Sequence, residues 1–293
     1  QAIALGPRTL VTLRGSFSLT AAEWIFEHAT WSSFVTAHLS GLSSTHLTGR
    51  PFEGLVNLTS LTISDNNVEG IEPSVLASLP NLRVFGARAN KLSSLSPALF
   101  RHNHNLVQVN LANNQLPSLP DAIWQSTPNL DFVRLEHNTI TSITAGVFRG
   151  LARLTNLQLH NNKLTFVHAD AFKDLTSLER LAMGQNLLPS LPTGLFRAQS
   201  RLKFLLLADN RLASLDKDHF QALTSLDTLD LTSNSLSTVP EGVLRNLRSV
   251  SEIRLVNNGL GSLPPTTFRG LSTLKVLWLA RNGISSLHPG MFH

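Results

Sequence analysis

Side chains that could bind a ligand gather between residues 105 and 200, at positions that recur every 24 residues. They combine aromatic rings, amides and charges, which is the composition of a binding hot spot. The group comprises Asn110, Phe132, Arg134, Glu136, His137, Asn156, Gln158, His160 and Arg180, with Phe204 and Leu206 as an apolar spot further along. The alternative is a solvated surface that carries polar residues whatever the function of the protein.

Three of these residues could also support catalysis or metal binding. Glu136 and His160 occupy equivalent positions in adjacent 24-residue units, and His137 follows Glu136. A carboxylate beside imidazoles could hold a metal or act as a general base, but an exposed ion pair is the commoner use of such residues. The sequence has no nucleophile elbow, glycine-rich phosphate loop or His-Glu-x-x-His pattern. We therefore predict that the protein is not an enzyme and has no metal or cofactor.

Two further sets of charged residues have structural interpretations. Asp230, Arg254 and Trp278 are equivalent positions in consecutive units, which predicts a salt bridge and a cation–π contact that support the fold. A stripe of cations is a less favoured site for a polyanion such as a sulfated glycan or nucleic acid, because no aromatic residues interleave for base stacking. The stripe contains Arg101, Arg149, Lys173, Arg197, Arg245 and Arg269.

A short strand in each unit must position these side chains. Residues Leu154–Leu175 show the pattern L-x-x-L-x-L-x-x-N-x-L, in which Leu157 and Leu159 alternate with period 2 and so lie on one face of a strand. The Asn follows the strand, and its amide can satisfy backbone groups in the turn. Such an Asn recurs every 24 residues, at positions 66, 90, 114, 138, 162, 186, 210, 234, 258 and 282.

An apolar residue, usually Phe, stands ten residues after each Asn and returns bulk to the same interior. One unit cannot bury its own apolar face, so units must stack, with parallel strands about 4.8 Å apart. We predict an α/β-type repeat solenoid, a horseshoe with a parallel concave sheet and a mostly irregular convex side. The residues six, four and two places before each Asn then point away from the core, and these positions hold most of the candidate binding residues.

The period also predicts the domain organisation. Residues 33–293 form an array of about eleven repeats, the last of them incomplete, and residues 1–32 form a degenerate repeat or N-terminal cap with a short helix near 21–29. Leu42 replaces the ladder Asn, which predicts an irregular turn, and Ala87 and Asn103 stand at Leu positions as weak points of the core. The last repeat lacks its closing Leu, which favours a fragment of a longer protein.

Composition excludes several classes of protein. The chain has 293 residues, a formal net charge of +5 and no Cys, so it has neither a disulfide framework nor a metal site built on thiolates. No apolar run approaches the roughly 18 residues of a membrane-spanning helix, which predicts no membrane insertion of this segment. The basic charge is not clustered as in nucleic-acid binders.

The repeat unit resembles that of a known family. Leu202–Leu223 follows L-x-x-L-x-L-x-x-N-x-L-x-x-L-P-x-x-x-F-x-x-L except at Asp216, and Val250–Leu271 follows it with Val250 and Ile253 in place of Leu. This unit is similar to the 24-residue leucine-rich repeats of Toll-like receptors, variable lymphocyte receptors and Slit proteins. The resemblance implies a receptor-like scaffold, extracellular or at the cell surface, that binds proteins or glycans on its concave face. Those proteins carry Cys-rich caps that this chain lacks.

We therefore predict noncatalytic recognition of a protein or glycan ligand on the concave face, centred on the residues given first. Asn57 begins the sequon Asn-Leu-Thr, which predicts a glycoprotein. The alternative is a structural or assembly module, part of a larger repeat protein, that associates with itself or with other chains through its ends or edges.

Overall fold

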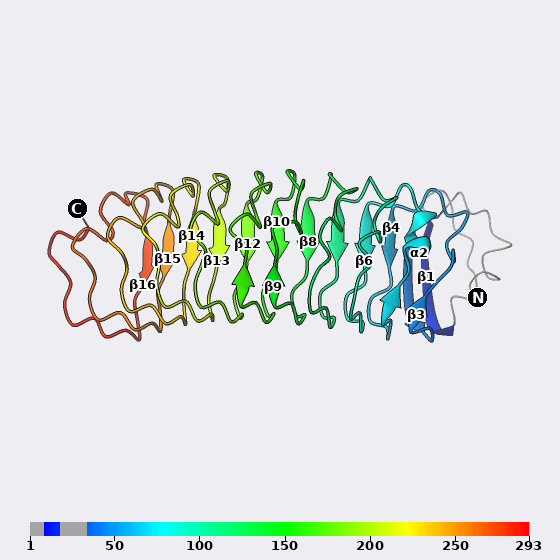
Figure 1. The fold of residues 1–293 in the computed structure, drawn as a ribbon, viewed down its shortest axis with the longest axis horizontal. Helices are drawn as coiled ribbons and strands as arrows, with labels where there is room; N and C mark the ends of the chain where they lie inside the picture. The colour runs from blue at the N-terminus through cyan, green and yellow to red at the C-terminus, as the bar shows by residue number, and fades with distance from the viewer. Residues whose placement is uncertain (1–8, 18–33, 293) are drawn as a thin grey trace. The chain divides into compact units, whose positions relative to one another are not determined.

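A computed structural model describes residues 9–17 and 34–292. The chain divides into two compact units, Gln1–Thr139 and Ile140–His293, and each is described by itself. Figure 1 colours their strands in chain order. The helix predicted near residues 21–29 lies outside the described residues, and the predicted boundary between residues 32 and 33 stays a prediction. No helix within the described ranges is long and apolar enough to cross a membrane.

The first unit is a stack of coils whose strands pair in parallel and in sequence order. Its main strands are β1 (Thr9–Phe17), β2 (Phe34–Leu42), β4 (Ser60–Thr62), β6 (Val84–Gly86), β7 (Gln108–Asn110) and β8 (Phe132–Arg134). A second, smaller sheet pairs β3 (His46–Leu47) with β5 (Gly70–Ile71), and the short helix α2 (Pro73–Ala77) follows β5.

The second unit repeats this arrangement. Its main strands are β10 (Asn156–Gln158), β12 (Arg180–Ala182), β13 (Phe204–Leu206), β14 (Thr228–Asp230), β15 (Glu252–Arg254) and β16 (Val276–Trp278). A small sheet pairs β9 (Ser142–Ile143) with β11 (Phe166–Val167). Strand residues pair with those 24 positions later, as Asn156 does with Arg180. The predicted solenoid of stacked coils with a parallel sheet and little helix is confirmed.

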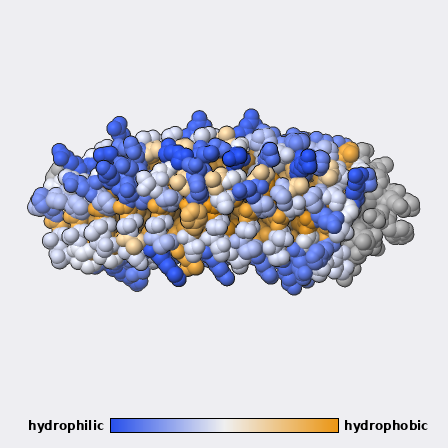
Figure 2. Space-filling model, viewed as in Figure 1, coloured by the Kyte–Doolittle hydropathy of each residue, from blue (hydrophilic) through white to orange (hydrophobic). Residues whose placement is uncertain are grey.

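Alternation along each strand places the core. Leu157, the central residue of β10, is fully buried, whereas Asn156 and Gln158 on either side are half-buried. Aromatic residues stand ten places after most of the ladder Asn residues and pack against one another in the interior, with ring centroids 6.5 Å apart between Phe172 and Phe196. On the face shown in Figure 2, apolar residues lie along the middle and hydrophilic residues toward both edges. Most main strands therefore have one face fixed by packing and one face available for other uses, whereas all three residues of β14 are buried.

The recurring Asn side chains connect neighbouring coils. Asn114 is 7% exposed, and its Nδ2 donates to the carbonyl oxygens of Ala87 and Leu111, each at 3.0 Å. Its Oδ1 accepts from the backbone N–H of Leu92, also at 3.0 Å. The same contacts recur at the other ladder positions, for example at Asn210. Because each amide joins the backbone of its own coil to that of the preceding one, the ladder holds the coils in register.

The coil at Leu42 departs from this pattern, as predicted. The Oδ1 of Asn66 accepts from the N–H of Leu42, which lies 24 residues earlier, whereas Asn114 bonds to the N–H that lies 22 residues earlier. Leu42 ends a strand of nine residues, and Gly41 before it has a φ of +78°. Without an Asn at position 42, the strand continues to the point where the other coils have already turned.

Asn103 needs a correction. It is fully buried at a Leu position, but its Nδ2 donates to the carbonyl oxygens of Leu76 and Leu79, each at 2.9 Å. Gln199 occupies the equivalent position in the second unit and donates to Phe172 in the same way. Both NH2 groups therefore join adjacent coils, although the amide oxygens, Asn103 Oδ1 and Gln199 Oε1, have no hydrogen-bond partner.

The residue before each ladder Asn adopts a left-handed backbone conformation. Its φ lies between +53° and +57° at all ten positions from Asp65 to Arg281, and none of these residues is Gly. Ala122, in a different part of its coil, has a φ of +61° where Gly194 and Gly242 have +77°. For a residue with a Cβ this conformation costs about 1–2 kcal/mol, so Ala122 stores strain that glycine at the equivalent positions avoids.

Replacing a ladder Asn should destabilise the fold strongly. Asn114→Ala leaves two carbonyls and one N–H without their buried partner, so we expect a loss of about 2–4 kcal/mol in the free energy of unfolding. Urea titration followed by circular dichroism measures the loss. The matched control is Asn67→Ala, an exposed Asn beside the ladder, which should change stability by less than about 0.5 kcal/mol. Equal effects of the two substitutions would contradict the ladder's role.

Glycine at position 122 should stabilise the protein. Ala122→Gly removes the left-handed strain, and the greater entropy of the unfolded chain offsets part of the gain, so we expect about 0.5–1 kcal/mol of added stability. The control is Ala77→Gly at the end of α2, where φ is not in the left-handed region, so the greater entropy of the unfolded chain should lower stability by about 0.4–1 kcal/mol. Thermal unfolding of both variants tests the sign of each change, and a lower midpoint for Ala122→Gly would show that the turn is unstrained.

Candidate functional site

The exposed faces of the strands carry the predicted binding residues. In β8, Phe132 and Arg134 flank the buried Val133 and point away from the core. The guanidinium carbon of Arg134 lies 4.8 Å from the centre of the Phe132 ring. This cation–π contact holds both side chains in a defined position on the surface.

Asn110 is the strand neighbour of Arg134 in the first unit. Its Oδ1 accepts a hydrogen bond of 3.1 Å from the backbone N–H of Ala112, which fixes the orientation of the amide. Glu136 is half-buried, and His137 is exposed at one of the left-handed positions. The structure thus brings Asn110, Phe132 and Arg134 together on adjacent strands, and puts Glu136 and His137 just beyond the end of β8.

A hollow of about 260 Å³ opens beside these residues. Gly86 is one of the residues that line it, and a Cβ at this position would lie 3.3 Å from the Thr62 Oγ1. Sequence reasoning missed this hollow, since it depends on a side chain that is absent and not on one that is present. Its lining comprises Thr62, Ser64, Val84, Phe85, Gly86, Gln108, Val109, Asn110, Phe132 and Arg134.

The second unit carries the rest of the predicted site. Arg180 and Phe204 are paired strand neighbours, and the guanidinium carbon lies 5.3 Å from the ring centre. Asn156, beside Arg180, accepts a hydrogen bond from the Gln158 side chain on the same strand. The half-buried His160 follows β10. The second unit therefore also presents an aromatic–guanidinium pair next to amides.

The predicted contact between Glu136 and His160 stays a prediction, because these residues belong to different units. Within the described part of the chain, no group of three or more His, Cys, Asp or Glu residues could hold a metal ion. Asn57 is exposed, and its glycosylation stays a prediction.

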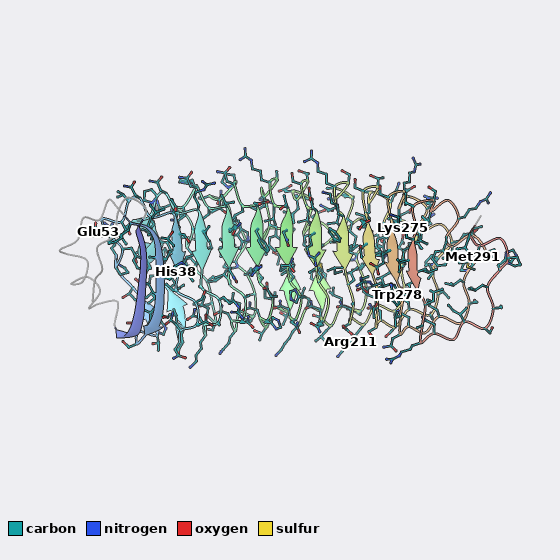
Figure 3. All side chains as sticks on the ribbon, turned by 180° about the vertical axis from the view of Figure 1, so that it is seen from behind. His38, Glu53, Arg211, Lys275, Trp278 and Met291 are labelled. Carbon is teal, nitrogen blue, oxygen red and sulfur yellow. The ribbon has the colours of Figure 1, made fainter. Side chains whose placement is uncertain are left out.

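The charged network on β14–β16 is partly as predicted. Arg254 Nη1 lies 3.3 Å from Asp230 Oδ2, which confirms the salt bridge. Trp278, labelled on β16 in Figure 3, does not form the predicted cation–π contact: its Nε1 donates to Glu252 Oε1 at 2.8 Å. Glu252, which the sequence analysis did not single out, also accepts two hydrogen bonds from Arg254. The hydrogen bonds between the two side chains lower the pKa of the Glu252 carboxyl and raise the pKa of the Arg254 guanidinium. Both groups are therefore charged at neutral pH and form an ion pair.

Two members of the cation stripe are also paired. Arg197 Nη2 lies 2.5 Å from Asp170 Oδ1, and Arg245 Nη2 lies 3.7 Å from Asp218 Oδ1. The hydrogen bond from Arg197 lowers the pKa of the Asp170 carboxyl. Carboxylates along the stripe reduce its attraction for a polyanion.

Sequence reasoning also missed His219, which is 5% exposed beside the buried Phe220. Its Nδ1 accepts from the N–H of Asp216 at 2.9 Å, so the proton is on Nε2, which lies 3.0 Å from the carbonyl oxygen of Leu191. Burial lowers the pKa of this imidazole, and the nearby charge of Asp216 partly opposes the shift. The folded protein thus favours neutral His219.

Comparison with known proteins identifies the family. A leucine-rich repeat model matches residues 38–92, 128–188, 200–260 and 248–293. The chain belongs to the leucine-rich repeat family. A search of curated proteins finds no match.

Solved leucine-rich repeat structures have similar folds. A chain of a complex of TLR13 with single-stranded RNA is 25% identical, with a TM-score of 0.77 over 89% of this chain and 42% of that one. A chain of the Drosophila Toll–Spätzle complex is 23% identical, with a TM-score of 0.82 over 93% of this chain and 41% of that one. A chain of an octameric complex of Latrophilin 3, Unc5D and FLRT2 is 24% identical, with a TM-score of 0.75 over 92% and 82%. This chain thus spans less than half the length of the first two.

Acid should weaken the second unit through His219. The unfolded imidazole binds a proton near pH 6.5, whereas the folded one does so only at lower pH. Stability is therefore full above pH 6.5 and falls below it, by up to about 1.4 kcal/mol for each pH unit, until the folded imidazole also becomes protonated.

Urea unfolding of the native protein and of His219→Leu, at pH 7.5 and pH 5, checks this expectation. Leucine occupies the equivalent position at Leu195, so the variant should fold. The other histidines are present in both proteins, so their contributions to the pH dependence of stability cancel. The native protein should lose more stability than the variant between the two pH values, and equal losses would show that His219 is not the cause.

Proposed function

We propose that this chain is a noncatalytic recognition module that binds a protein ligand through the exposed faces of its strands. The observation that supports this is the pairing of an aromatic ring with a guanidinium on both units, Phe132 with Arg134 and Phe204 with Arg180. Aromatic residues and Arg dominate the energy of protein–protein hot spots. Each unit carries its own set of proposed binding residues. They are Asn110, Phe132, Arg134, Glu136 and His137 on the first unit, and Asn156, Gln158, His160, Arg180 and Phe204 on the second.

A protein fits this surface better than a nucleic acid does. Binding of single strands relies on ring faces that stack with bases, and here a guanidinium already lies over each of the two Phe rings. Two of the similar structures are complexes with protein partners, Toll with Spätzle and FLRT2 with Latrophilin 3 and Unc5D. We therefore propose a location outside the cell, where such a ligand would be met, and treat a glycan ligand or self-association as alternatives.

A binding panel tests the proposal. The purified chain is presented to secreted proteins, cell-surface ectodomains, glycans and a second copy of itself, and affinities are measured by surface plasmon resonance. For a protein ligand, Phe132→Ala with Arg134→Ala should reduce affinity by about thirtyfold or more, because truncation of a hot spot costs about 2 kcal/mol or more.

The matched control is Phe166→Ala with Lys163→Ala, which also removes an aromatic ring and a cation. Phe166 is 54% exposed on β11, in the small sheet and not on the main strand face. The control should leave affinity unchanged. Unaltered binding of the Phe132/Arg134 variant would reject this site, and binding only to glycans or to itself would favour the corresponding alternative.

A further inference from the structure

We infer that the hollow over Gly86 receives one carboxylate, an Asp or Glu side chain of the protein ligand, and that Arg134 pairs with it. The inference rests on the proposed function and names the chemistry that this part of the surface recognises. It concerns the first unit alone, where the hollow is lined by residues of β4, β6, β7 and β8.

Arg134 supplies the charge. It is exposed, and among the described residues no carboxylate lies within ion-pair distance of it. Its guanidinium is held over the Phe132 ring, which limits the conformations that binding must restrict. The guanidinium has five N–H donors in a planar fork that matches the two oxygens of a carboxylate.

Neutral donors stand on the neighbouring strands. The Oδ1 of Asn110 is occupied by the N–H of Ala112, so the free end of this side chain is the NH2 group, which can only donate. Across Gly86, the Thr62 hydroxyl also faces the hollow. An incoming carboxylate would therefore meet one cation and further hydrogen-bond donors.

The charge of the lining selects a ligand with a single negative charge. The residues around the hollow include one cation and no carboxylate. Glu136 follows Arg134 by two residues but does not line the hollow. One guanidinium with neutral donors balances one carboxylate, whereas a phosphate would bring up to two charges.

Gly86 makes the space. The residues at the equivalent strand positions on β4, β7 and β8 are Thr62, Asn110 and Arg134, which all have polar side chains. A side chain at position 86 would occupy the hollow between them. The φ of Gly86 is not in the left-handed region, so the backbone does not require glycine here. The effect of the glycine is that it leaves the hollow open.

The test uses short random peptides displayed on phage and selected on the purified protein. We expect the enriched peptides to share an Asp or Glu. A synthetic peptide of that sequence should lose about ten- to a hundredfold in affinity when its acidic residue is replaced by Asn or Gln, because a charge-assisted bidentate pair is lost. Isothermal titration calorimetry measures the affinity of the acidic peptide and of its Asn or Gln version.

Variants of the protein locate the contact. Arg134→Gln and Gly86→Val should each weaken the acidic peptide at least tenfold, the first by removing the charge and the second by filling the hollow. Arg134→Lys should restore only part of the affinity, since the fork is lost. The control is Arg211→Gln, which removes an exposed guanidinium that is not among the proposed binding residues and does not line the hollow, and it should have no effect.

The outcomes separate this inference from the proposed function. If peptides bind, and lose affinity in the Phe132→Ala/Arg134→Ala variant, but tolerate both loss of their acidic residue and Gly86→Val, the carboxylate site is refuted while recognition at this surface stands. If no acidic peptide is enriched, or if enriched peptides are indifferent to every variant, the inference is likewise overturned.

Discussion

The structure depends on the hydrogen bonds of the buried Asn amides between neighbouring coils. Where the chain turns at the end of a strand, backbone N–H and C=O groups lose their hydrogen-bond partners on the neighbouring strand. When such groups are buried, they need other hydrogen-bond partners. Asn114 satisfies them with one side chain, which reaches two carbonyls and one N–H in adjacent coils. Because the amide carries both a donor and an acceptor, an Asp or a Leu cannot make the same set of contacts, and the strand continues to Leu42 where a Leu stands at the ladder position. The spacing of the Asn residues therefore sets the length of every coil.

This dependence explains why the fold could be predicted. Leu157, Leu159 and Asn162 define the interior of a coil by type and spacing, and the parallel register follows once each coil has the same length. Rows of outward side chains could be assigned from the same count, and Phe132 and Arg134 do lie on the exposed face of β8.

Other features lie beyond pattern reading, for reasons that differ from residue to residue. The hollow over Gly86 is a missing side chain, which no search for chemical groups detects. The Trp278 indole N–H donates to Glu252, and the ring does not lie against Arg254. Position along the strand does not determine this contact, because it depends on the rotamer of the Trp278 side chain. Asn103 and His219 occupy positions that are apolar in most other repeats. Their hydrogen bonds to backbone carbonyls can be recognised only from the structure.

The left-handed residue before each ladder Asn has a further consequence. Its backbone is the same in every coil, yet the position is occupied by Asp, Ala, Asn, His, Gln, Ser or Arg. The neighbouring amide holds this conformation, so the identity of the side chain is free to vary at a modest energetic cost. Each unit thus carries, once in each of these coils, a position whose side chain can change while the backbone beneath it keeps the same φ.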